Sequence, residues 1–362
     1  MGEEEAVRLL EGLVRIPSPS GREAEASAWL VERMKETGFQ ARVDEAGNAV
    51  GLRGSGKKEI LLLGHIDTVP GEIPVRREGN LLHGRGTVDA KGPLSAFLLA
   101  AAGADLSEGW RITVVGAVEE EAATSKGARH VLATRSAPPD FLVVGEPSRW
   151  DRIALGYKGR LLLDLSLRAP LSHSAGKELL PAEVGVLAWE RIRNWCARWN
   201  RDGGTRGVFD SLDPSLRSFH TTPEGTHVLV ELEIGFRLPP GLDPGRLGED
   251  LAALLEDLEG ARAAFAFRGA ERAVRLPRRG PLAAAFLSAI REQGGSPRFV
   301  VKTGTCDLNV LHPAWPETPA LVYGPGDSAL DHTPGEHIDL EEYLRAIRVL
   351  RSALERIMEA NR

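Results

Sequence analysis

The sequence predicts an α/β fold, in which a mixed, mainly parallel sheet carries helices on both faces and a smaller α+β domain is inserted. Two observations favour this fold. Over the first 150 residues, short apolar strand patterns alternate with helical patterns, an order typical of a largely parallel sheet. Over residues 160–267 the order resembles a βαββαβ module of the ferredoxin-like kind, and strands and helices then alternate again.

The first helices and strands follow from hydrophobic periodicity and from residues that end a helix. Ala6, Leu9 and Leu13 share one helical face, and a second helix over 23–37 ends before Gly38. The apolar run 59–63 predicts a buried strand. The other elements expected in this part are strands at 41–43, 49–52, 111–118 and 141–144 and helices at 90–102 and 126–133.

The composition changes near residues 157–159 and again near 279–280. Between these points we expect strands at 160–167, 228–237 and 261–267, helices at 181–199 and 247–258, and mobile loops at 203–204 and 211–225. Beyond them we expect helices at 282–291 and 340–358 and strands at 298–301 and 320–323. We therefore assign residues 1–158 and 271–362 to one domain and residues 159–270 to the inserted domain.

Bulk composition indicates an ordinary globular chain. Hydrophobic residues make up 42% and charged residues 27%, and the net charge of −6 argues against nucleic acid as a partner. The two cysteines, Cys196 and Cys306, lie far apart in the sequence, which fits a reducing cytoplasm. Because the sequence has neither a signal peptide pattern nor an apolar run long enough for a membrane span, we expect a cytoplasmic protein with no membrane partner.

Histidine and acidic residues follow the predicted strands, at the ends where open α/β sheets bind ligands. His65 and Asp67 come after the strand 59–63, and Asp89 precedes the helix 90–102. Further candidates are Glu119, Glu120, Glu121, Glu146, Asp331 and His332. Crowded carboxylates repel one another unless cations neutralise them, and imidazole with carboxylate suits zinc, with cobalt or manganese as alternatives. The pattern therefore predicts a two-metal hydrolase site.

These motifs resemble those of the M20 metallopeptidase family, and the resemblance spans the whole chain. It rests on Gly64-His65-Ile66-Asp67, Gly84-Arg85-Gly86-Thr87-Val88-Asp89, Glu119-Glu120-Glu121, Gly145-Glu146-Pro147 and Asp331-His332. It implies a zinc-peptidase-like catalytic domain, whose inserted domain serves as a lid and dimerisation domain in a homodimer. It also implies two divalent metal ions as cofactors, zinc or else cobalt.

The resemblance implies a metal-binding role for five residues. His65 and Glu146 would bind one ion, His332 and Glu121 would bind the other, and Asp89 would bridge the two. A carboxylate can bridge in this way because the ions of two-metal sites lie about 3.5–4 Å apart.

Two catalytic roles follow from the same resemblance. Asp67 would hold the second ring nitrogen of His65, and Glu120 would be the general base that later returns a proton to the leaving amine. Two alternatives stay open: Glu119 with Glu120 in place of Glu120 with Glu121, and His312 or His337 in place of His332.

Substrate contacts are expected from residues beyond the metal ligands. His173 matches the family's lid histidine, which would stabilise the oxyanion in the partner subunit's site. Gly304-Thr305-Cys306-Asp307 resembles a substrate-pocket loop in which cysteine here replaces serine. We therefore expect substrate binding by His173, Lys302, Thr305 and Asn309. Cys306 and Asn309 depart from the pattern of the diaminopimelate enzymes and weigh against that substrate.

Two arginine clusters bear on the substrate. They are Arg191, Arg193, Arg198, Arg201 and Arg206, and Arg268, Arg272, Arg275, Arg278 and Arg279. They either form a solvated face or dock an acidic partner. The second interpretation favours, within the family, the hydrolases of lysine and arginine biosynthesis that release lysine or ornithine from an acidic amino-group carrier protein.

Other functions remain as alternatives. Within the family, these are a hydrolase of an acetylated small amino acid such as acetyl-lysine or acetyl-ornithine, a desuccinylase, or a dipeptidase or carboxypeptidase. A non-catalytic binding protein would need a missing metal ligand or base, and every expected position is filled. A dinucleotide-binding oxidoreductase is disfavoured because the glycines around Gly84 lack the G-x-G-x-x-G spacing that opens a helix.

Overall fold

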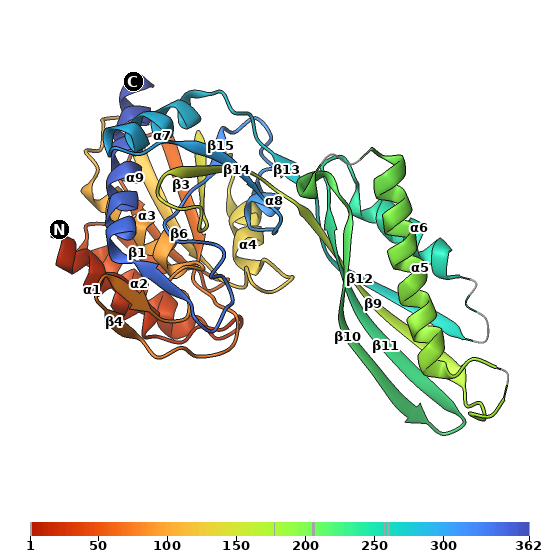
Figure 1. Cartoon of the computed structure of the whole chain (residues 1–362). Helices are drawn as coiled ribbons and strands as arrows, with labels where there is room; N and C mark the ends of the chain where they lie inside the picture. Colours follow the sequence, from red (N-terminus) through yellow and green to blue (C-terminus); the bar gives the residue numbers. More distant parts are fainter. Residues whose placement is uncertain (1, 177, 205–206, 257, 259–260, 362) are drawn as a thin grey trace. The chain divides into compact units, whose positions relative to one another are not determined.

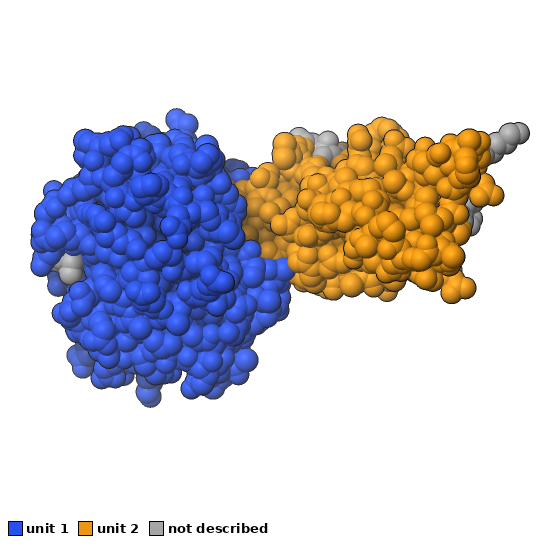
Figure 2. Space-filling view, turned by 90° about the horizontal axis from the view of Figure 1, so that it is seen from below, with its two compact units in different colours: residues 1–155, 276–301, 306–362 blue, residues 156–275, 302–305 orange. Residues whose placement is uncertain are grey.

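The computed structural model describes residues 2–176, 178–204, 207–256, 258 and 261–361. These fall into two compact units (Figure 2). The first comprises residues 1–155, 276–301 and 306–362, and the second comprises residues 156–275 and 302–305. The sequence-based bounds of 159–270 for the inserted domain therefore omit 156–158, 271–275 and the short return segment 302–305.

A sheet of nine strands has the order β1-β2-β6-β3-β7-β15-β8-β13, with β14 also paired to β8. Most of its strands belong to the first unit, whereas β13 belongs to the second. The central strands β6, β3, β7 and β15 run parallel, whereas the pairs toward both edges are antiparallel. The strands are β1 (Gln40–Val43), β2 (Ala49–Arg53), β3 (Lys58–His65), β6 (Trp110–Ala117), β7 (Phe141–Gly145), β8 (Arg152–Tyr157), β13 (Val274–Arg275), β14 (Arg298–Lys302) and β15 (Ala320–Val322).

Helices pack against this sheet, with α1, α2, α3 and α9 toward one side in Figure 1 and α4 and α8 toward the other. The helices of this unit are α1 (Glu3–Val14), α2 (Ala24–Glu36), α3 (Lys91–Gly103), α4 (Lys126–Thr134), α7 (Pro281–Glu292), α8 (Leu308–Leu311) and α9 (Leu340–Ala360). The predicted mixed, mainly parallel α/β fold is thus confirmed. No helix in the described ranges is long and apolar enough to cross a membrane.

The central strand and the central helix position the metal-ligand candidates. The residues 60–63 of β3 are fully buried because helices and neighbouring strands enclose them, which explains the unbroken apolar run. The helix α3 contacts β3, β6 and β7 and also α9, and its small side chains let it approach the sheet closely. Consequently His65 at the end of β3 and Asp89 just before α3 meet at one edge of the sheet.

A second, smaller sheet lies in the loops of this unit, and the sequence analysis missed it. It joins β16 (His337–Asp339), β5 (Leu81–His83) and β4 (Arg76–Glu78) in that order, with antiparallel pairing. Three-residue strands give too short a pattern to recognise from sequence. This sheet ties the segment that follows His332 to the segment that precedes Asp89.

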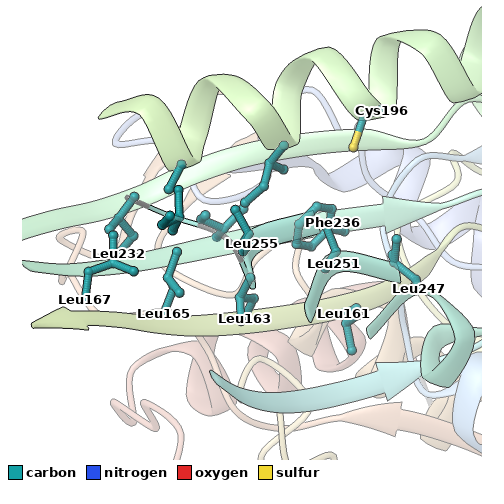
Figure 3. Close-up of a cluster of buried hydrophobic side chains, with 14 of the residues drawn as sticks. Leu161, Leu163, Leu165, Leu167, Cys196, Leu232, Phe236, Leu247, Leu251 and Leu255 are labelled. Atoms are coloured by element: carbon teal, nitrogen blue, oxygen red, sulfur yellow. The ribbon is translucent and has the colours of Figure 1, made fainter. Parts of the chain in front are cut away.

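The second unit is a βαββαβ module with the strand order β10-β11-β9-β12, all antiparallel, as expected of the ferredoxin-like arrangement. Its elements are β9 (Gly159–Pro170), α5 (Pro181–Asp202), a 3₁₀ turn (Val208–Asp210), β10 (Asp213–Glu224), β11 (His227–Leu238), α6 (Pro244–Leu255) and β12 (Arg262–Glu271). Alternate leucines of β9 point toward residues of α5 and α6, including Cys196 (Figure 3).

The expectation of a mobile loop over 211–225 is wrong, because most of it forms the edge strand β10. This strand is largely exposed, so its polar composition imitates that of a loop. It pairs with β11 through a tight turn at Gly225, whose φ of +61° suits glycine.

Candidate metal centre

The histidine and acidic candidates of the first unit converge at the carboxyl ends of adjacent parallel strands. His65 ends β3, the Glu119–Glu121 run follows β6, and Glu146 follows β7. The loop that carries His332 and the turn that carries Asp89 complete the group. The structure therefore brings together all seven residues that the sequence analysis proposed as metal ligands, general base or histidine-orienting carboxylate.

The centre of this group is Asp89, whose two carboxylate oxygens face two different histidines. Its Oδ1 lies 3.1 Å from Nε2 of His65, and its Oδ2 lies 3.1 Å from Nε2 of His332. Glu121 Oε1 is 2.9 Å from the same His332 nitrogen, and Glu146 Oε1 is 4.0 Å from His65 Nε2. The side chains thus form two sets, one around each histidine, that share one carboxylate.

Electrostatics at this edge favour added positive charge. Burial raises the pKa of Glu120 and of Glu146 well above the usual range, and neighbouring carboxylates raise both further. The hydrogen bonds that His332 donates to Asp89 and Glu121 raise its pKa to about 10. The chain supplies four buried carboxylates here but only two histidines, and this imbalance is one that bound divalent cations would correct.

The donor set fits metal ions. Ligand atoms of His65, Asp89 and Glu121 all lie within 4.8 Å of one another, close enough to surround one ion. Imidazole nitrogen with carboxylate oxygen is a ligand combination of zinc, and cobalt and manganese accept the same atoms. A carboxylate with one oxygen facing each of two histidines could serve two neighbouring ions at once.

Asp67 lies against the second ring nitrogen of His65, which is where the sequence analysis expects it. The nearest acceptor to His65 Nδ1 is the main-chain carbonyl oxygen of Asp67, at 2.9 Å, whereas its carboxylate Oδ1 lies 3.5 Å away. The carboxylate instead accepts hydrogen bonds from the Ser20 hydroxyl at 2.7 Å and from the main-chain N–H groups of Glu120 and Glu121 at 3.1 and 3.0 Å. Asp67 therefore holds both His65 and the glutamate turn.

The three consecutive glutamates point in different directions. Glu119, at φ +57°, places its carboxylate near Lys126 Nζ at 3.3 Å and accepts a hydrogen bond from Thr124. Glu120 is buried, and Glu121 reaches His332. This geometry favours the register in which Glu120 and Glu121 serve the metal centre.

The alternative histidines lie elsewhere. His337 donates from Nδ1 to the carbonyl oxygen of Gly335 at 2.7 Å and packs against the ring of His83. His312 follows the short helix α8, and burial lowers its pKa. In the described part of the chain, His332 pairs with Asp89 and Glu121, whereas neither of these two rings does.

Three of the four substrate-binding candidates belong to the second unit. His173 is exposed, and its Nδ1 accepts a hydrogen bond from the N–H of Ala175 at 3.1 Å. The Thr305 hydroxyl donates to the carbonyl oxygen of Lys158 at 2.8 Å and accepts from Arg237. The carbonyl oxygen of Lys302 accepts a hydrogen bond from the main-chain N–H of Lys158. Within that unit, Thr305 and Lys302 both contact the start of β9.

The fourth candidate, Asn309, is buried in the first unit. Its Oδ1 accepts a hydrogen bond from the N–H of Cys306 at 3.0 Å and so closes the turn before α8. Burial raises the pKa of the Cys306 thiol well above its usual value, as befits a packed side chain rather than a nucleophile.

The sequence analysis missed two residues that hold the ligands in place, Ser20 and Glu336. Ser20 bonds Asp67 as described, and Glu336 accepts hydrogen bonds from the turn before Asp89. The sequence places Glu336 four positions after His332 but does not show that this acidic residue is buried. For Ser20 no pattern distinguishes it from any serine in a loop.

The arginine clusters differ from one another. In the second cluster, Arg268 pairs with Asp164 and Glu233, Arg272 with Asp243 and Arg275 with Asp210. In the first cluster, Arg193, Arg198 and Arg201 are exposed on α5, and Arg206 lies outside the described residues. Arg278 and Arg279 of the second cluster are exposed as well, so both clusters present arginine side chains to solvent.

Comparison with known proteins identifies the family. The sequence profile of Peptidase family M20/M25/M40 matches residues 61–356. The chain belongs to this family. Among relatives, a LysW-lysine hydrolase of Deinococcus radiodurans is 47% identical over 98% of this chain and 97% of its own length. A putative LysW-lysine/LysW-ornithine hydrolase of Thermococcus kodakarensis is 41% identical, covering 99% of this chain and 93% of the relative.

Solved structures support the M20 fold. An M20 family metallo-carboxypeptidase of Sulfolobus solfataricus superposes with a TM-score of 0.80 at 18% identity, covering 98% of this chain and 99% of that one. A Bacillus subtilis protein described as a dinuclear metal-binding M20 peptidase has a TM-score of 0.69 at 14% identity, covering 99% and 98%. With its family membership and its hydrolase relatives, the chain is a metal-dependent hydrolase of amide bonds.

Proposed function

We propose that this chain hydrolyses, in the cytoplasm, the amide bond that links lysine or ornithine to an amino-group carrier protein, with two zinc ions as cofactors. The observation that carries the chemistry is Asp89, whose carboxylate is shared between His65 and His332. The substrate rests on the full-length likeness to relatives named for LysW-linked lysine and ornithine.

The residues would hold the ions in two sets. His65 and Glu146 form one set and His332 and Glu121 the other, with Asp89 common to both. When bound, a pair of divalent ions lowers the pKa of a water molecule and polarises the scissile carbonyl group.

The chain's own side chains manage the proton. Glu120 accepts it on its carboxylate as general base and then gives it to the leaving amine nitrogen. Since the His65 Nδ1–H is held by the carbonyl oxygen of Asp67, the Nε2 lone pair of His65 is directed toward Asp89. The Asp67 carboxylate keeps the glutamate turn in register.

The second unit contributes recognition. We assign oxyanion stabilisation in the partner subunit of a homodimer to His173, and substrate contact to Lys302 and Thr305. Asn309, which is buried, acts through the Cys306 turn. The exposed arginines of α5, Arg193, Arg198 and Arg201, contact an acidic carrier.

A turnover panel tests the substrate. Zinc-loaded protein is given carrier-linked lysine, carrier-linked ornithine, acetyl-lysine, acetyl-ornithine and succinyl-diaminopimelate, and amine release is measured. We expect the carrier-linked substrates to be hydrolysed with the highest kcat/KM. Preference for an acetylated or succinylated substrate overturns the substrate proposal, and full turnover after exhaustive chelation overturns the metal proposal.

Mixing two inactive variants tests the homodimer. In a mixed dimer of His173→Ala and Glu120→Gln chains, one of the two sites has both intact residues if His173 acts across the subunits. We therefore expect the mixture to regain activity that neither variant has alone. A mixture that stays inactive although exchange of subunits is shown by sedimentation contradicts the role of His173 in the partner's site.

A further inference from the structure

Glu336 is a buried carboxylate that the catalytic scheme does not use. Its Oε1 accepts hydrogen bonds from the N–H groups of Gly86, Val88 and Asp89 at 2.9, 3.0 and 3.2 Å. Its Oε2 accepts one from Arg85 Nη1 at 2.7 Å. A fully buried carboxylate is stable only when such donors satisfy it, so its partners are a built binding site for this side chain.

The glycine-rich turn is shaped to receive that carboxylate. Gly86 has φ +86°, and a Cβ there would lie 2.9 Å from Thr68 Cγ2 and 3.0 Å from Lys91 Cδ. With glycine at this position, the N–H groups of Gly86, Val88 and Asp89 can converge on one carboxylate oxygen. The motif Gly84-Arg85-Gly86-Thr87-Val88-Asp89 therefore has a local purpose in binding Glu336, besides ending in the metal-ligand candidate.

Glu336 also joins two segments that are distant in the sequence. It follows His332 by four residues, and its carbonyl oxygen accepts the N–H of Gly84 at 3.3 Å. Directly afterwards β16 pairs with β5, with His337 opposite His83. Glu336 therefore connects the His332 loop to the Asp89 turn twice, once through its side chain and once through its main chain.

We propose that Glu336 is a positioning residue that clamps the His332 loop to the Asp89 turn and so sets the affinity of the ion held by His332, Glu121 and Asp89. This inference rests on the two metal sites of the proposed function. The ion held by His65 and Glu146 depends less on Glu336, because β3 and β7 position those two ligands.

The test is a titration of metal-free protein with cobalt. Calorimetry and the visible absorption of the bound cobalt monitor each binding step. His332→Ala identifies which of the two binding steps belongs to the His332 side. Glu336→Gln keeps the shape but replaces one acceptor oxygen by an amide NH₂ group, which opposes the N–H donors or Arg85. We expect the His332-side step to weaken by about 10- to 100-fold, with the other step changed far less.

Two further variants keep the test decisive. Glu336→Asp retains the charge but is one methylene shorter, and we expect an intermediate loss; it serves if Glu336→Gln does not fold. Glu59→Gln is the matched control, because Glu59 is also a buried carboxylate paired with arginine in the same unit. We expect Glu59→Gln to bind both cobalt ions with the affinity of the unsubstituted chain.

The outcomes separate this inference from the proposed function. If the unsubstituted chain does not bind two cobalt ions, the proposed metal centre fails. If it binds two and Glu336→Gln binds both equally well, or weakens both steps alike, the clamp is overturned. Selective loss of the His332-side ion, with an unchanged circular dichroism spectrum of the metal-free protein, supports it.

Discussion

The two ends of β3 carry buried acidic residues in opposite electrostatic settings. At its start, Glu59 accepts hydrogen bonds from Arg111 at 2.8 Å, Arg135 at 2.5 Å and Thr113 at 2.6 Å. Burial raises the pKa of Glu59, but these three donors outweigh it, and its pKa lies below the ordinary value. The chain itself supplies the cations that this carboxylate needs.

At the other end, beyond His65, the chain supplies carboxylates in excess. The pKa values of Glu120 and Glu146 are raised well above the ordinary range by burial, and neighbouring carboxylates raise both further. An acidic residue whose charge is neutralised internally contributes to stability, whereas a cluster left short of positive charge is built for a cation from outside. The comparison teaches that burial of an acidic residue alone does not indicate function.

Replacing one glutamate by glutamine at each end of β3 should give the largest difference in kcat. Glu120→Gln removes the general base and should lower kcat by about 10²- to 10⁴-fold, while two metal ions still bind. Glu59→Gln should leave kcat unchanged. Steady-state kinetics with a metal count per chain measures both. Loss of metal from Glu120→Gln would show that Glu120 is a ligand and would return the Glu119–Glu120 register to consideration.

Metal removal should lower the stability of the folded chain through the site beyond His65, and the Glu59 end of β3 should not take part. Zinc at about 100 times its Kd stabilises the folded chain by about 2.7 kcal/mol for each ion bound, and chelation removes that increment. The thermal midpoint of the unsubstituted chain and of Glu59→Gln should therefore rise by the same amount on adding zinc. Asp89→Asn, which weakens the shared ligand, should show little rise. An equal rise in Asp89→Asn contradicts the shared site.

The arginine-paired end should govern stability in acid. Glu59→Gln leaves Arg111 and Arg135 without their carboxylate and should lower the free energy of unfolding by about 1–3 kcal/mol at pH 7. Because the pKa of Glu59 is lower in the folded state, its contribution is complete above its unfolded-state pKa and disappears as pH falls through the folded-state value. Denaturant titrations of both proteins should converge as the pH is lowered into that range. A difference that persists unchanged in acid contradicts this account.

Much of this contrast could be predicted from sequence, since β3 is an unbroken apolar run that ends in His65 and Asp67. The family motifs then identified the residues that the structure gathers around Asp89. The sequence also predicted most of the longer strands and helices of both units, because their hydrophobic periods are long enough to recognise. It missed β8 and α8, the three strands of the small sheet, and β10.

The features that the sequence analysis missed depend on main-chain pairing or on contacts between distant segments, which leave no local pattern in the sequence. The edge strand β10 is held by main-chain hydrogen bonds to β11 rather than by burial of its side chains, so no alternation marks it. Glu336 meets the Asp89 turn across some 250 residues, and one sequence does not reveal such a contact.

A third setting completes the comparison, namely arginines whose charge no carboxylate neutralises. Among the described residues, Arg198 on α5 has no ion pair, whereas Arg268 in the same unit has two. If the α5 face docks an acidic carrier, Arg198→Glu should raise KM for carrier-linked lysine by about 5-fold at most, the range of an exposed charge pair. kcat and the turnover of acetyl-lysine should not change.

Arg262→Glu is the matched control for this substitution. Arg262 is also exposed and in the second unit, but it lies opposite Arg168 on the sheet face away from the leucines that contact α5. The KM increase of Arg198→Glu should shrink as salt rises, because the Debye length falls from about 10 Å at 0.1 M to about 3 Å at 1 M. If both substitutions raise KM alike, only the net charge matters, and the α5 face is no docking surface.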